Sequence, residues 1–191
     1  MAEMVMAKVL ALSGSARKGS YSRAALDVAV AAARKLGATV DLYDLGENKL
    51  PPFDGSEQVE KEHPAVLDLK RRAKEADALL LATPVYHDSY SGVLKNTLDL
   101  LYYEEVSDKL AGLIAVGGGR IGHGQALEHL RAVLREMGAW VLPRQVLVGS
   151  SSDCFGEDGQ LKDPELLSRL GLLGQELVLR SKLFRTRRRA P

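Results

Sequence analysis

Residues 8–22 read KVLALSGSARKGSYS, and the order of residue types in this stretch decides the fold. Its first six residues form a nearly continuous apolar run before Gly14, which predicts a strand covered on both faces of a sheet. A polar loop follows, and an alanine-rich segment then predicts a helix from about Ser20 to Leu36, ended by Gly37. A buried strand that leads through a short loop into a helix is typical of a parallel α/β sheet.

The same alternation continues along the chain and predicts a sheet with helices on both faces. Four further strands are expected, over Thr39–Tyr43, Ala78–Ala82, Leu110–Val116 and Trp140–Val148. Further helices are expected over Pro64–Glu75, Gly92–Tyr103, Gln125–Met137 and Pro164–Leu183. Loops are expected around Pro51–Gly55 and over Thr83–Ser91, Gly117–Gly124 and Ser150–Lys162. No repeat or linker interrupts the pattern, so we predict one domain over residues 1–183 and a basic tail over 184–191.

Composition excludes several classes of protein. A chain of 191 residues can bury roughly 70% of its unfolded surface in one domain. The 26 basic and 25 acidic residues give a net charge of +1, so we expect no nucleic-acid or membrane partner, and we expect the short arginine-rich terminus to be solvated. Cys154 is the only cysteine, which excludes an internal disulfide. No signal peptide or membrane-spanning run is recognisable, so a cytoplasmic location is expected.

Ligands of open α/β sheets bind outside the carboxyl ends of the strands, which directs attention to the loops there. The loop after the first strand carries hydroxyls on Ser15, Ser20 and Ser22 and the cation of Arg17, at the start of a helix. Hydroxyls, a guanidinium and a helix amino terminus together favour binding of a terminal monophosphate. The alternative is that serine and glycine simply form a turn and an N-cap.

Two more loops complete the expected site. Thr83–Ser91 combines a rigid proline with two aromatic residues, and it could accept a flat, mostly apolar ring such as a flavin, although Tyr86 could equally be an ordinary packed tyrosine. In the run Gly117–Gly118–Gly119, consecutive glycines would let the main chain approach such a ring, unless the loop is merely flexible. The formal G-x-G-x-x-G match of Gly117, Gly119 and Gly122 follows the fourth strand and lacks an acidic ribose partner, so we discount it.

These loops together resemble those of the NADPH-dependent FMN reductase family of flavodoxin-like proteins, over nearly the whole chain. Gly14–Arg17 with Ser20 and Ser22 is similar to the family's G-S-x-R-x-x-S loop. Thr83–Tyr86 with Gly92–Asn96 is similar to its T-P-x-Y…G-x-L-K-N signature. Many members have T-P-E-Y-N, whereas Val85 and His87 stand here, and this form is similar to the flavin reductases of alkanesulfonate assimilation. The acceptor stays open, since quinone, azo-dye, chromate and organoarsenic reductases share the scaffold.

The resemblance implies a flavodoxin-like three-layer sandwich with a five-stranded parallel sheet in the order 2-1-3-4-5. It implies bound FMN, NADPH or NADH as electron donor, and a homodimer or homotetramer. Hydride would pass from the nicotinamide to the flavin and then to free flavin, a quinone or a similar acceptor, without a side chain acting as acid or base. A flavodoxin-type electron carrier that does not use NAD(P)H is the alternative. We expect no metal site, and FMN contacts from Ser13, Ser15, Arg17, Ser20, Tyr21, Ser22, Thr83, Pro84, Val85, Tyr86, His87, Gly117, Gly118 and Gly119.

Overall fold

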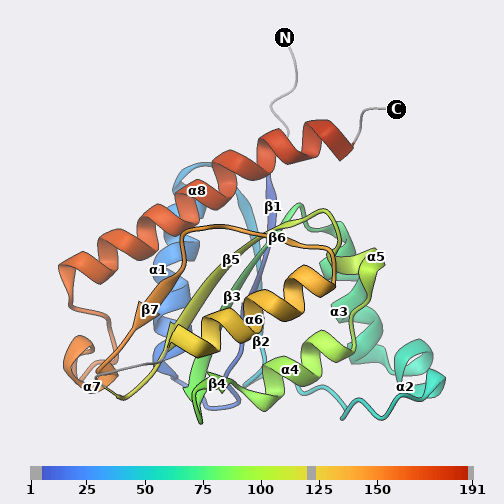
Figure 1. The fold of residues 1–191 in the computed structure, drawn as a ribbon, viewed down its shortest axis with the longest axis horizontal. Helices are drawn as coiled ribbons and strands as arrows, with labels where there is room; N and C mark the ends of the chain where they lie inside the picture. The colour runs from blue at the N-terminus through green and yellow to red at the C-terminus, as the bar shows by residue number, and fades with distance from the viewer. Residues whose placement is uncertain (1–5, 120–123, 189–191) are drawn as a thin grey trace.

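A parallel sheet forms the centre of the protein in the computed structural model, which describes residues 6–119 and 124–188 (Figure 1). Its strand order is β2-β1-β3-β5-β6, and β7 also pairs with β5. All of these pairings are parallel, which confirms the predicted order 2-1-3-4-5 once β5 is counted as the fourth strand and β6 with β7 as the fifth. The strands are β1 (Lys8–Ser13), β2 (Thr39–Asp44), β3 (Ala78–Tyr86), β5 (Leu110–Val116), β6 (Trp140–Val141) and β7 (Val146–Val148).

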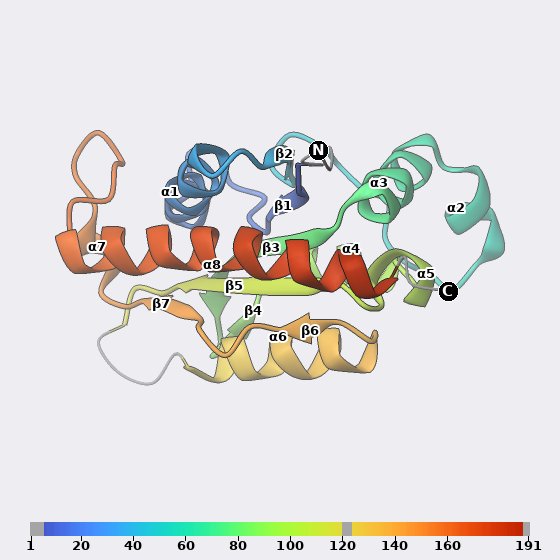
Figure 2. The same cartoon turned by 90° about the horizontal axis from the view of Figure 1, so that it is seen from above.

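Helices cover both faces of the sheet. In Figure 1 the strands run between α1 (Tyr21–Lys35) and α8 (Pro164–Arg188) on one side and α3 (Pro64–Glu75), α4 (Gly92–Asp99) and α6 (Gly124–Glu136) on the other. Figure 2 shows the short helices α7 (Ser151–Cys154) and α2 (Glu57–Glu62) at opposite ends of the molecule. The predicted three-layer sandwich is therefore confirmed.

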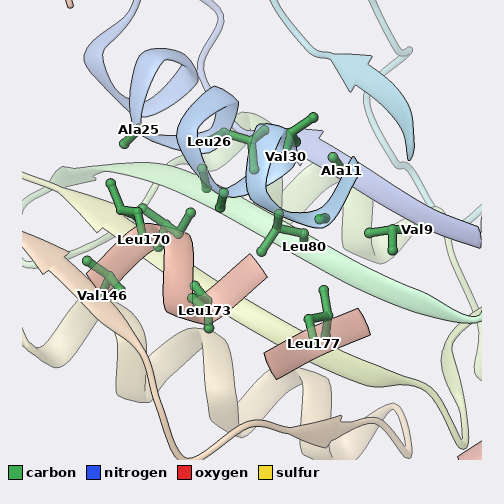
Figure 3. Packing of buried hydrophobic residues seen from close by; sticks show 14 of the residues in the cluster. Val9, Ala11, Ala25, Leu26, Val30, Leu80, Val146, Leu170, Leu173 and Leu177 are labelled. Carbon is green, nitrogen blue, oxygen red and sulfur yellow. The ribbon is translucent and has the colours of Figure 1, made fainter. Parts of the chain in front are cut away.

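The continuous apolar run of the first strand is explained by a core on each face. Val9 belongs to the cluster packed against α1 and α8, and the next residue, Leu10, belongs to the cluster packed against α3, α4 and α6. Figure 3 shows the first cluster, in which Val9 and Leu80 of the sheet lie near Val30 of α1 and Leu173 of α8. Because the residues from Val9 to Leu12 are buried against one face or the other, this strand shows no polar alternation in its sequence.

Two helices approach each other closely on the α1–α8 face. A Cβ atom added to Gly174 of α8 would lie 2.1 Å from the carbonyl oxygen of Ala29 in α1. Only a residue without a side chain allows the two backbones to come this near. Gly174 thus sets the distance between α1 and α8.

The prediction of a loop over Thr83–Ser91 was wrong in part. β3 continues through Pro84 to Tyr86, and the chain turns back as the short antiparallel strand β4 (Ser89–Tyr90). The turn residues His87 and Asp88 both have positive φ, at 49° and 60°. This is the geometry of a two-residue hairpin, which usually carries Asn-Gly or Asp-Gly; without a glycine, and with a proline in the strand, the hairpin has no sequence signal.

Other boundaries also differ from prediction. The helix expected over Gly92–Tyr103 ends at Asp99 and is followed by α5 (Tyr103–Val106), because the buried side chains of Leu100 and Leu101 turn the chain toward the core. The expected strand Trp140–Val148 is split into β6 and β7 around Pro143, which cannot donate to a strand ladder. The short helices α2 and α7 were not predicted, because neither is long enough to show an apolar period.

The last helix continues past its predicted end at Leu183. α8 extends to Arg188, so the expected basic tail begins inside a helix. Arginine has a high helix propensity, and cations near a helix carboxyl terminus interact favourably with its dipole. Residues 189–191 lie outside the described part of the chain. Among the described residues, no helix combines the length and the apolarity that crossing a bilayer requires.

Candidate functional site

A cavity of about 200 Å³ lies where β1, β3 and β5 reach their carboxyl ends. It brings together most of the residues that the sequence pointed to, and none of the described side chains in its lining is acidic. The lining consists of Ser15, Arg17, Ser20, Tyr21, Ser22, Pro84, Val85, Tyr86, Val116, Gly118 and Ser151. Four serine hydroxyls and one guanidinium, with no carboxylate among the described lining residues, form a surface that favours an anion.

One end of the cavity is built on the amino terminus of α1. Ser20 is the N-cap, and its Oγ accepts a hydrogen bond from the Arg23 N–H at 3.2 Å, so the capping alternative is correct for this residue. The Oγ atoms of Ser20 and Ser22 are 3.1 Å apart, and Ser15 Oγ accepts from the Arg17 N–H at 3.2 Å. The three hydroxyls therefore cluster at a helix terminus, where backbone N–H groups of the first turn lack an intrahelical acceptor.

Arg17 supplies the charge at this end. Its side chain is exposed, and among the described residues it forms no salt bridge with a carboxylate. Its guanidinium carbon lies 5.8 Å from the centre of the Tyr21 ring, and that ring stacks on Phe155 at 4.3 Å between centroids. The stacked pair orients the arginine at the mouth of the cavity while leaving its N–H groups available to an anion.

The β3–β4 hairpin forms the second wall. Pro84, Val85 and Tyr86 line the cavity, and Tyr86 is 55% exposed, so it is not an ordinary packed tyrosine. Thr83 is fully buried instead: its Oγ1 accepts from the Ser91 N–H at 3.0 Å and therefore supports the hairpin from beneath. His87 occupies the turn and is not part of the lining.

The third wall is the glycine-rich loop after β5. Gly118 lines the cavity, and a Cβ atom built on it would have no heavy atom within 4 Å. Its neighbours anchor the loop to the segment after β7: the Ser151 N–H donates to Gly117 O at 3.1 Å, and the Ser150 N–H donates to Gly119 O at 3.0 Å. Gly117 and Gly119 thus hold Gly118 in place without lining the cavity. The rest of the loop, residues 120–123 with Arg120 and His123, lies outside the described residues.

Sequence reasoning missed two residues that line the cavity, and five of its predicted contacts, Ser13, Thr83, His87, Gly117 and Gly119, are not among the described lining residues. Val116 and Ser151 line the cavity but follow no motif; Ser151 could have been found by noting that β7 ends at the same edge as β5. Ser13 was expected to contact the ligand, but it is completely buried at the end of β1 and does not line the cavity. Its Oγ has no hydrogen-bond partner within the described part of the protein.

Cys154 is close in sequence to Ser151 but is not among the described residues that line the cavity. Burial raises the pKa of its thiol, and Asp163 and Asp153 add to the effect, so the group is a thiol and not a thiolate at neutral pH. Its Sγ donates to Gly149 O at 3.4 Å. Within residues 6–119 and 124–188 no group of three or more His, Cys, Asp or Glu side chains is placed to hold a metal ion.

The sequence profile described as NADPH-dependent FMN reductase matches residues 7–153, which include all three walls of the cavity. The chain belongs to the NADPH-dependent FMN reductase family. Membership makes it an FMN-dependent NAD(P)H oxidoreductase, and it confirms the enzyme prediction over that of an electron carrier without NAD(P)H use.

Curated relatives agree with this assignment. The FMN-dependent NADPH-azoreductase of Staphylococcus haemolyticus is 33% identical over 180 residues, which cover 93% of this chain and 90% of the relative. The azoreductase of the same description from Staphylococcus aureus strain USA300 is 33% identical over 176 residues, covering 90% of this chain and 93% of the relative. The alkanesulfonate link seen in the sequence stays a prediction.

Solved structures show the same fold. The flavoenzyme FerB of Paracoccus denitrificans, an NAD(P)H:(acceptor) oxidoreductase, superposes with a TM-score of 0.76 at 24% identity, over 94% of this chain and 99% of that chain. An NADH:FMN oxidoreductase named EMOB, in its apo form, superposes with a TM-score of 0.71 at 23% identity, over 90% of each chain. At these identities the likeness supports the flavodoxin-like architecture of this family member.

Proposed function

We propose that the cavity at the strand ends holds FMN with its phosphate against the amino terminus of α1. The observation that carries this proposal is the lining as far as the structure describes it, in which four serine hydroxyls and Arg17 converge and no carboxylate is present. Ser15 and Ser22 are placed to donate to phosphate oxygens, with Arg17 pairing with the charge. A terminal monophosphate fits this small hydroxyl cluster, which favours FMN over FAD.

The flavin ring would lie between the hairpin and the glycine-rich loop. Pro84, Val85 and Tyr86 offer backbone and a flat apolar surface, and the open space above Gly118 lets the main chain approach the ring without a side chain intervening. The proposed FMN contacts are therefore Ser15, Arg17, Ser20, Tyr21, Ser22, Pro84, Val85, Tyr86 and Gly118. Ser13, Thr83, His87, Gly117 and Gly119 would act by supporting these residues.

Bound FMN supplies the redox chemistry, accepting hydride from a nicotinamide and passing electrons to an acceptor. The chain's own residues bind the phosphate, orient the ring and leave one of its faces open. Within the described part of the lining no side chain is placed as a general acid or base, since that part holds neither a carboxylate nor a histidine. We propose flat aromatic acceptors such as azo compounds, quinones or free flavin, a choice supported by the azoreductase descriptions of the relatives.

Anaerobic stopped-flow absorbance tests this function. Protein reconstituted with FMN should bleach on mixing with NADPH alone, and an azo dye or quinone added afterwards should restore the flavin colour in a separate half-reaction. Steady-state data should then give parallel double-reciprocal lines. If dithionite bleaches the flavin but neither NADPH nor NADH does so within seconds, the proposed reaction is wrong.

We also propose that the protein is a cytoplasmic homodimer or homotetramer in which a partner subunit helps to cover the flavin. Support comes from Tyr86 and Val93, which are 55% and 38% exposed beside the cavity. α8 adds the exposed leucines Leu172, Leu179 and Leu183, and exposed apolar groups of this kind often mark interfaces. Light scattering that gives the mass of a monomer for the fully active enzyme would contradict this proposal.

A further inference from the structure

A second pocket lies beside the amino terminus of α4, outside the flavin cavity. Its volume is about 240 Å³, and its walls are mainly apolar. Leu45, Leu50 and Pro52 come from the chain after β2, and Val93 comes from α4. Asn48 and Lys49 add polar groups to the same pocket. An apolar slot with a few polar groups at its edge has the composition of a small-molecule site.

The pocket is held open by one asparagine of α4. Asn96 donates through Nδ2 to the carbonyl oxygen of Pro51 at 2.9 Å, and its Oδ1 accepts from the Phe53 N–H at 2.8 Å. The amide therefore fixes the loop after β2 on both sides of Pro52, one of the wall residues. A pocket shaped before its ligand arrives loses less conformational entropy on binding.

An open hollow connects this pocket to the flavin cavity. The hollow shares Arg17 and Tyr86 with the flavin cavity, and it shares Ala16, Gly92 and Val93 with the pocket beside α4. A continuous surface path therefore leads from the wall of the flavin cavity at Tyr86, past Arg17 of the loop after β1, to the pocket beside α4. An elongated ligand could occupy all three hollows at once.

Lys49 lines the second pocket, and no described carboxylate neutralises the charge of its ammonium group. Its side chain is exposed, and its only hydrogen bond within the described part of the chain is a long one, from Nζ to the carbonyl oxygen of Leu45 at 3.5 Å. Among those residues it has no carboxylate partner. An apolar slot beside such an ammonium group suits a ligand that combines a flat ring with a nearby phosphate.

We propose that the pocket beside α4 receives the adenosine half of NADPH and that Lys49 binds the 2′-phosphate. The proposal rests on the proposed function, the reduction of bound FMN by NADPH, because it requires the nicotinamide to lie over the flavin beside Tyr86. The rest of the dinucleotide must then cross the protein surface, and the hollow at Arg17 and Val93 supplies a path for it. The adenine would lie against Leu50, Pro52 and Val93. Since the 2′-phosphate is the only difference between NADPH and NADH, Lys49 would set the preference between them.

Calorimetric titration of the FMN-loaded protein tests the assignment without turnover. Adenosine 2′,5′-bisphosphate and 5′-AMP serve as probes, because they differ only in the 2′-phosphate. The bound FMN already occupies the proposed phosphate site at the amino terminus of α1, so neither probe can bind there. We expect the bisphosphate to bind at least about tenfold more tightly than 5′-AMP, as is typical of a charge-assisted hydrogen bond. Lys49→Met should remove this difference, Lys49→Arg should keep most of it, and Lys35→Met, a change of the same kind on an exposed lysine at the end of α1, should leave it unaltered.

Turnover gives a second measurement. In Lys49→Met, the ratio of kcat/KM for NADPH to kcat/KM for NADH should fall about tenfold relative to the unmodified protein, while Lys35→Met keeps the original ratio. An unchanged ratio in Lys49→Met, or equal binding of the two probes to the unmodified protein, would overturn the assignment of Lys49. Failure of the underlying function would look different, since neither NADPH nor NADH would then reduce the bound flavin in any variant.

Discussion

Replacing Arg17 with alanine is the most direct test of the proposed phosphate site, which consists of Arg17 and the hydroxyls of Ser15, Ser20 and Ser22. Among the described residues, Arg17 is the only cation in the lining of the flavin cavity, and it has no carboxylate partner. Hydrogen bonds to charged groups contribute about 1.5–3 kcal/mol. Because the Arg17 side chain is exposed, solvent screens part of its attraction, so we expect a loss at the lower end, about 1.5 kcal/mol. The dissociation constant of FMN should rise about tenfold.

Quenching of flavin fluorescence on titration into apoprotein measures this constant. Lys18→Ala provides the matched control, because Lys18 lies in the same loop and carries the same charge but does not line the cavity. Its effect should be well under half that of Arg17→Ala and should vanish in high salt, as expected for long-range attraction alone. Equal losses of FMN affinity in the two variants would show that Arg17 makes no specific contact with the phosphate. An unchanged dissociation constant for Arg17→Ala would refute the proposed phosphate site.

Two glycines provide further predictions. Gly118→Val should abolish FMN binding at micromolar concentration, because the added side chain enters the open space of the cavity. The melting temperature of the apoprotein should stay within about 2 °C of the original, since Gly118 does not have a positive φ. Loss of secondary structure in circular dichroism would contradict this prediction. Gly174→Ala should destabilise the protein by about 1–3 kcal/mol, because its Cβ would meet the backbone oxygen of Ala29 at 2.1 Å. The control Gly171→Ala, where no atom lies within 4 Å, should instead stabilise α8 by about 0.5–1 kcal/mol in thermal denaturation.

The sheet could be predicted because its strands are buried on both faces. β1 and β5 were located to the residue, since an unbroken apolar run bounded by polar loops has few other interpretations. The hairpin after β3 could not be predicted, because Pro84 interrupts the strand pattern and the turn at His87 and Asp88 depends on tertiary support for two left-handed residues. Local sequence carries no trace of that support.

The candidate site was predictable to the extent that motif residues and lining residues coincide. Ser15, Arg17 and Tyr86 were found because each belongs to a loop at the carboxyl end of a strand. Ser151 was missed because its contribution depends on β7 pairing with β5, a fact of topology. The second pocket was missed for the same reason, since the contact of Asn96 with Pro51 spans 45 residues of sequence.

The two pockets share one rigid support, which connects flavin binding to nucleotide binding. Ser91 is the N-cap of α4: its Oγ accepts from the Leu94 N–H at 3.2 Å and donates to the carbonyl oxygen of Gly14 at 2.5 Å, while its own N–H donates to Thr83. These buried hydrogen bonds connect the loop after β1, the β3–β4 hairpin that carries Tyr86, and the amino terminus of α4, which lines the second pocket. Breaking any of them would leave a buried polar group unsatisfied, at a cost of about 1–3 kcal/mol. The loop after β1, the hairpin and the start of α4 are therefore held in fixed relative positions before either ligand arrives, so a nicotinamide stacked at Tyr86 would find the second pocket already in place.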